Sequence, residues 1–170
     1  MHIAKLLSIL ALGSPSAAWA ADSATPAPEY SFQAEAPVRL RGGPVDVRWQ
    51  TVPFNRTYAQ LSPSERAAFK SQYVDMPEAD EPPFPLGGLK QIYDPIGQGQ
   101  AALGATGALV MEVVVGADGE PQEVHVLRSP NKQVTRFVAG VAMVTKFKPA
   151  VCSGKPCRAS FPVRVQFRME

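Results

Sequence analysis

Histidine, cysteine, net charge and long apolar runs are all scarce in this chain of 170 residues. It contains two His and two Cys, and 17 Lys+Arg against 15 Asp+Glu leave a formal net charge of +2. So small a charge argues against nucleic acid as a partner. No uncharged apolar run reaches the ~18–20 residues that cross a bilayer. With so few metal-binding or general-base side chains, we expect neither a metal site, nor a cofactor, nor an enzyme.

Proline is abundant instead, and the overall composition is that of a folded protein. Hydrophobic residues make up 45% and charged residues 19%, which argues against wholesale disorder. The 17 Pro indicate that part of the chain is extended. The length fits one modest domain preceded by a tail.

Residues 1–20 have the pattern of a secretory signal peptide. A short polar start is followed by the apolar stretch Leu6–Leu12, and Ala18-Trp19-Ala20 supplies small residues for cleavage after Ala20. An uncleaved membrane anchor is the alternative, but the uncharged run is short for a span and contains Pro15. We therefore expect a secreted protein with no membrane span left after cleavage.

Cys152 and Cys157 enclose the turn-forming insert Ser-Gly-Lys-Pro. In an exported protein this spacing predicts a disulfide, which stabilises the fold by about 2 kcal/mol in the chain-entropy model. A thiol–disulfide exchange protein is the alternative. Redox cysteines usually form C-x-x-C at a helix start, and neither that spacing nor a helix signal is present here.

The region 21–81 is predicted to be a Pro-containing, partly extended segment. Short strands are expected at Pro37–Arg41 and Val45–Gln50, and a short helix near 62–73. The helix has a clear start, because Ser62-Pro63-Ser64-Glu65 combines an N-cap, Pro at the first position and a capping box. Prolines from 77 to 85 place a boundary near residue 80. Whether this region packs on the rest of the chain stays open.

The region 82–170 predicts an α+β domain, a small antiparallel three-stranded sheet packed on two helices. Its first strand should be central and its last strand should lie at an edge. The apolar stripe of the second helix is expected to include Val134, Phe137, Val138, Val141 and Val144. The expected elements are a helix at Leu86–Leu103, strands at Gly107–Val115 and Glu123–Arg128 joined by Asp118-Gly119, a helix from Ser129-Pro130, and a strand from Ser160 with Phe161, Val163, Val165 and Phe167 inward and Arg164, Gln166 and Arg168 outward.

This ordered set resembles the C-terminal domain of TonB-type energy transducers over about residues 83–168. Each element is common by itself, and the resemblance lies in their order and spacing. The matching elements are Phe84-Pro85 before a helix, the strand Gly107–Val115, Asp118-Gly119, Val124-x-Val126-x-x-Ser129, Phe137, Phe147-x-Pro149 and the terminal strand.

The resemblance implies a periplasmic binding protein, exported across the inner membrane. Domains of this family capture an extended peptide, the TonB box of an outer-membrane receptor, as an added strand at the edge of the sheet. A second receptor contact lies near a Tyr-Pro step, which is Phe84-Pro85 here and lacks the phenol hydroxyl. Family members also dimerise by strand exchange, so a homodimer stays open. Carried over residue by residue, the peptide-binding strand is Phe161, Pro162, Val163, Arg164, Val165, Gln166 and Phe167.

One departure from the family limits the prediction. Family transducers keep an N-terminal membrane anchor, which this chain is expected to lose on export. The expected function is therefore peptide binding linked to TonB-dependent transport, without energy transduction by the chain itself. An envelope scaffold or assembly protein that uses the same edge for another periplasmic protein is the alternative. Val165→Pro is expected to abolish either kind of strand addition, by removing a backbone donor at the edge.

Overall fold

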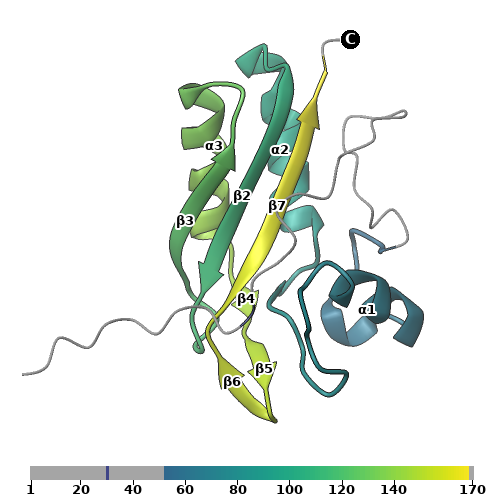
Figure 1. Ribbon diagram of the computed structural model, residues 1–170. Helices are drawn as coiled ribbons and strands as arrows, with labels where there is room; N and C mark the ends of the chain where they lie inside the picture. The colour runs from purple at the N-terminus through teal and green to yellow at the C-terminus, as the bar shows by residue number, and fades with distance from the viewer. Residues whose placement is uncertain (1–29, 31–51, 169–170) are drawn as a thin grey trace, which may run out of the picture.

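The computed structural model describes Tyr30 and residues 52–168 (Figure 1). The predicted signal peptide and the strands predicted at Pro37–Arg41 and Val45–Gln50 lie outside these residues. In chain order the elements are the 3-10 helix η1 (Tyr58–Gln60), α1 (Pro63–Lys70), β1 (Phe84–Pro85), α2 (Lys90–Leu103), β2 (Gly107–Val115), β3 (Pro121–Arg128), α3 (Lys132–Val144), β4 (Phe147–Lys148), β5 (Ala150–Cys152), β6 (Lys155–Cys157) and β7 (Ala159–Phe167).

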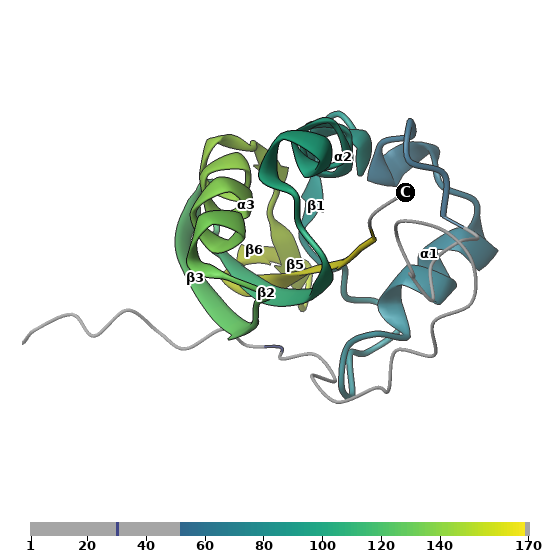
Figure 2. The ribbon, with the colours of Figure 1, turned by 90° about the horizontal axis from the view of Figure 1, so that it is seen from above.

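The main sheet is three-stranded and antiparallel, in the order β3-β2-β7. The helices α2 and α3 cover one of its faces (Figure 2). The α+β class, the three antiparallel strands and the central position of the first long strand are confirmed. Two short ladders, β1-β4 and β5-β6, complete the strands of the described region.

Alternating apolar residues account for the central strand. β2 has the predicted bounds, and Leu109, Met111 and Val113 are fully buried on one face. Its other face is also largely buried, as expected for a strand with neighbours on both sides. Gly119 closes the turn into β3 with a φ of 83°, which an L side chain rarely adopts.

Local capping signals fix the helix starts. Ser62 and Glu65 form the predicted capping box, in which the Ser62 N–H donates to Glu65 Oε2 at 2.7 Å. α1 ends at Lys70, earlier than predicted. α2 begins at Lys90 rather than near Leu86, after Gly88 with its φ of 87°. α3 begins beyond Ser129-Pro130, because Asn131 accepts the Val134 N–H and is the N-cap.

The predicted stripe of α3 is confirmed except at its end. Val134 and Val138 are fully buried, and Phe137 and Val141 are partly buried against the core. Val144 is 79% exposed, so its predicted burial is wrong. It is the last residue of α3 and lies on the margin of the stripe, where the helix leaves the sheet.

Residues 52–81 pack on the same core as the sheet and helices. Tyr58, Leu61, Phe69 and Tyr73 are buried in one hydrophobic cluster with residues of β1, α2, β2, α3 and β7. The question that the sequence left open is answered for this part of the N-terminal region. In both views α1 lies beyond β7, on the side away from β2 (Figures 1 and 2).

Candidate functional site

β7 is a long, regular strand at the margin of the sheet. Its nine residues pair with β2 without a register shift, from Ala159 opposite Val115 to Phe167 opposite Gly107. Within the part of the chain that the structure describes, β2 is its only neighbour in the ladder. A straight margin strand of this kind is the geometry that strand addition requires.

Pro162 shows which backbone groups of β7 face away from β2. Proline lacks an N–H, so within a ladder it occupies a position whose N–H side faces outward. Backbone groups alternate along a strand, so Arg164 and Gln166 point their N–H groups in the same direction. Consistent with this, the backbone of Arg164 lies close to the Tyr93 hydroxyl on α2 and acts to lower the pKa of that phenol, although burial raises it overall. Val165 faces β2, so Val165→Pro would break the ladder instead of removing an outward donor, and that earlier expectation is wrong.

The side chains of β7 are almost all buried. Phe161, Val163, Val165 and Phe167 face the core as predicted. Arg164 was predicted to be an outward charge protecting an open edge, but it is only 8% exposed, and this prediction is wrong. Its side chain lies near the phenols of Tyr73 and Tyr93, which come from other parts of the chain, rather than in water.

Residues 52–81, named here the cover segment, lie against the outer side of β7. The ring of Phe69 stacks on Phe161 with centroids 6.0 Å apart, and its edge meets Phe84 at 5.0 Å. Tyr73 is buried and interacts electrostatically with Arg164. Phe54 stacks on Tyr93 at 5.2 Å. The cover segment therefore reaches β7 through aromatic side chains.

The seam between the cover segment and the sheet is polar at its centre. Burial raises the pKa of Tyr73 well above its usual value. Among the described residues the Tyr73 hydroxyl and Gln72 Oε1 have no hydrogen-bond partner. Burial also raises the pKa of Glu112, which faces this seam beside Arg164. Buried polar atoms without partners cost free energy, so this seam is less stable than an apolar one.

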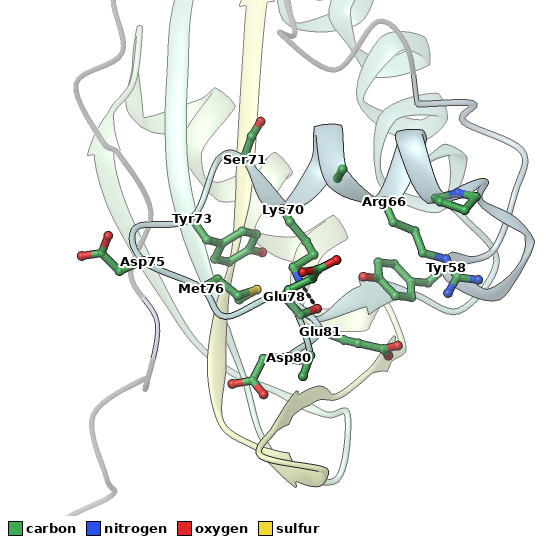
Figure 3. Close-up of a pocket in the computed structure, with 13 residues that line it drawn as sticks. Tyr58, Arg66, Lys70, Ser71, Tyr73, Asp75, Met76, Glu78, Asp80 and Glu81 are labelled. Atoms are coloured by element: carbon green, nitrogen blue, oxygen red, sulfur yellow. Dashed lines mark hydrogen bonds between the residues drawn. The ribbon is translucent and has the colours of Figure 1, made fainter.

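A groove of about 680 Å³ separates α1 from the loop at residues 73–81 (Figure 3). Arg66 and Lys70 project into it from α1, opposite Glu78 and Glu81. Lys70 Nζ donates to the carbonyls of Pro77 at 2.9 Å and Glu78 at 2.5 Å. These cations hold backbone of their own segment, so the groove presents no free cluster of one charge within the described region.

The charged groups at the end of the groove tie the cover segment to neighbouring elements. Asp80 accepts a hydrogen bond from the Tyr30 hydroxyl at 2.5 Å and one from the Ser153 N–H at 2.8 Å, and these bonds lower its pKa. Glu81 pairs with Lys148 at 3.0 Å. Burial lowers the pKa of Lys148 despite this pairing. These charged groups therefore hold segments of the fold together.

Phe84 and Pro85, the predicted second receptor contact, are buried. They form β1, which pairs with β4, and Phe84 contacts the rings of Tyr58 and Phe69. The next residue, Leu86, is 54% exposed. A partner could touch Phe84 directly only if the cover segment moved.

Cys152 and Cys157 form the predicted disulfide, with Cα atoms 5.8 Å apart. The bond closes the β5-β6 hairpin, whose Val151 makes an antiparallel bridge with Glu81. The hairpin leads directly into β7. This position indicates a structural role at the start of the margin strand.

A serine-type catalytic arrangement is not formed around His125. Glu112 lies opposite His125 of β3, and on its other side it is near Ser160 of β7, which pairs with Val114. In a triad the His must lie between the nucleophile and the carboxylate. His125 is largely exposed and pairs with Glu123 at 3.3 Å. These side chains therefore do not have the order of a serine-type triad.

The opposite margin of the sheet, β3, is irregular and exposed. Its register with β2 shifts twice, so that Gln122 and Leu127 are extra residues. Most of its side chains are exposed or half-exposed. Bulges and charges are devices that prevent edge pairing. Sequence reasoning did not predict these bulges, and it left open whether residues 30–80 pack on the domain, which depends on contacts between distant segments.

Within the described residues there is neither a group of three His, Cys, Asp or Glu able to hold a metal ion nor a helix long and apolar enough to cross a bilayer. No protein-family model matches the chain, and no curated protein matches its sequence. The candidate site described above consists of the β7 margin and the cover segment beside it.

Proposed function

We propose that the chain is a periplasmic protein, similar to TonB C-terminal domains, that binds an extended peptide by strand addition at β7. The peptide would be a TonB box of an outer-membrane receptor. The observation that carries the proposal is the unshifted nine-residue register of β7 at the margin, with Pro162 turned outward. Main-chain bonds to Arg164 and Gln166 would supply affinity, and the alternating side chains would set register.

Burial of β7 adds a condition to this proposal. Because Tyr93 and the cover segment contact the outer side of β7, a peptide can add only where these contacts yield. Gln166, which is half-buried, is the most accessible outward position. Binding would start at this end of the strand and extend toward Pro162.

A titration of the full chain with a synthetic TonB-box peptide tests the proposal. We expect backbone amide shifts in NMR spectra along 161–167, and loss of binding in Gln166→Pro, which removes an outward N–H. Gln166→Ala is the matched control, because it changes the side chain and keeps the donor. Unchanged binding in a folded Gln166→Pro variant would place the interface elsewhere.

The second candidate is an envelope scaffold that uses the same margin for another periplasmic protein. It differs only in its partner, so the peptide titration separates the two. A flat response to TonB-box peptides, together with a partner captured by cross-linking that is lost in Gln166→Pro, would favour the scaffold. The thiol–disulfide alternative is the least supported, since the cysteines close a hairpin.

A further inference from the structure

The attachment of the cover segment differs between its ends and its middle. At one end the Lys90 N–H donates to the Phe54 carbonyl at 2.9 Å. At the other end Glu81 and Val151 exchange two main-chain bonds of 2.9 and 2.8 Å. Between these points, among the described residues, main-chain bonds of 57–80 stay within the segment. Within the described residues the middle therefore contacts the sheet through side chains, and Tyr73 also takes part in a main-chain bridge.

Among the buried apolar side chains of this middle part, Phe69 is the one whose ring packs on β7 itself. Phe69 is fully buried from the last turn of α1 and contacts Phe84 and Phe161. The groove lies between α1 and the loop at residues 73–81, so these two parts of the cover segment are only partly packed against each other. Beside Phe69 lies the polar seam, in which the Tyr73 hydroxyl is buried without a partner among the described residues. The favourable packing of Phe69 therefore lies next to the unfavourable burial of the Tyr73 hydroxyl.

We propose that the cover segment is a displaceable guard of β7, fixed at Phe54 and at Glu81, which swings away from the strand when a guest peptide adds. This inference rests on the proposed function and states how peptide binding at β7 would be regulated. Closed, the guard shields the apolar margin from pairing with other chains. Open, it uncovers the side of β7 at Phe161 and Arg164, and Tyr93 of α2 must also yield before the Arg164 backbone can pair with a peptide. The apparent affinity for a peptide is then the intrinsic affinity reduced by the open fraction.

Two substitutions should move the guard in opposite directions. Phe69→Ala removes the anchor, raises the open fraction and is expected to tighten peptide binding by roughly tenfold or more. Tyr73→Phe removes the unpartnered hydroxyl, stabilises the closed state and is expected to weaken binding by about threefold to tenfold. Leu86→Ala is the control, because Leu86 is exposed outside the guard and outside β7.

The experiment measures two quantities on the full chain and each variant, the Kd for a synthetic TonB-box peptide and the hydrogen exchange of the Arg164 and Gln166 amides without peptide. The guard predicts faster exchange in Phe69→Ala and slower exchange in Tyr73→Phe. If Phe69→Ala does not fold, Ser62→Ala replaces it, since loss of the α1 cap loosens the same element.

The two proposals fail in different ways. Peptide binding with equal Kd in all variants, or exchange that does not change, overturns the guard and leaves strand addition standing. If hydrogen exchange changes as expected but no variant binds the peptide, the guard is supported. The TonB-box peptide is then ruled out as the ligand of β7. A Tyr73→Phe variant that binds more tightly contradicts the guard directly.

Discussion

The sheet ends in two strands of similar length, β3 and β7, whose margins differ in shape, charge and cover. β3 carries two register shifts, exposed side chains and the charges of Glu123 and Arg128. β7 has an unshifted register and buried side chains, and aromatic residues of the N-terminal region lie against it. An irregular margin needs no cover, whereas a straight apolar margin would pair with other chains if it were left open.

The difference indicates where a partner can add. Bulges re-aim backbone donors and acceptors, so a guest strand cannot pair along β3 over its whole length. β7 pairs without a register shift, Pro162 interrupts its outward N–H groups, and the described cover residues contact it through side chains. Under the guard proposal this cover is displaceable, whereas a bulge is permanent. Under this proposal, bulges protect β3 permanently from pairing with another strand, whereas β7 is protected only while its cover is in place.

The largest expected effect comes from substituting matched apolar residues on the two strands. Phe161→Ala should lower the free energy of unfolding by about 3–5 kcal/mol, because Phe161 contacts Phe69 and Phe147 in the core. Leu127→Ala, at an exposed bulge on β3, should cost less than about 0.5 kcal/mol. Urea unfolding measures both. Equal losses would show that the two margins are equally packed.

The turn before β3 offers the next test. Gly119→Ala should destabilise the fold by about 3 kcal/mol, since it strains a φ of 83° and puts a Cβ 2.2 Å from the Phe147 carbonyl oxygen. Gly154→Ala is the control, because Gly154 has a similar φ of 78° but open space around it. It keeps the backbone strain without the steric clash, so it should lower the free energy of unfolding by less. Thermal unfolding compares the two. A smaller loss for Gly119→Ala would mean that the β2–β3 turn does not need this close contact.

The disulfide should affect only the β7 side of the comparison. Replacing Cys152 and Cys157 by Ser should cost about 2 kcal/mol, because the bridge restricts the unfolded chain. Faster hydrogen exchange is expected at Glu81 and Val151, while β3 keeps its rates relative to global unfolding. Exchange measured by NMR tests this. A matching loss of local protection in β3 would contradict it.

The smallest expected effect is a loosening of the cover at acid pH. The Tyr30 hydroxyl and then the Ser153 N–H lower the pKa of Asp80 below 3.8, so its stabilising contribution is complete above that value. It is lost as pH falls through the lowered pKa. Amides of the cover segment should therefore lose protection below about pH 4, before β3 does. Asp80→Asn should remove most of this pH dependence. An unaltered acid response in that variant would exclude Asp80 as its cause.

Local signals in the sequence were sufficient for most elements. The alternation of β2 and β7, the Asp118-Gly119 turn and the capping box at Ser62 each depend on neighbours a few residues apart, and each was found where expected. The errors at the starts of α2 and α3 are also local, because each shifts a helix start by only a few residues. Gly88 and Asn131 decide these boundaries through backbone conformation and capping, which composition alone ranks poorly.

The candidate site depended on more than local signals. Arg164 looks like an exposed edge charge because alternation places it opposite the core face, yet Tyr73 and Tyr93, far from it in sequence, bury it. Val165 looks like an outward donor until Pro162 and the pairing with β2 fix the parity of the strand. Both errors concern what lies beside β7, a question that a one-dimensional pattern does not contain.

By itself the sequence determined the order of the elements, the apolar faces of the long strands and the pairing of Cys152 with Cys157, because short-range sterics and periodic burial fix these features. Only the tertiary structure decided that residues 52–81 fold back over β7 and that β3 is the bulged margin. The physical reason is that cover and register depend on contacts between segments far apart in the chain, whose free energy is set by packing in three dimensions and not by any one segment's own preference.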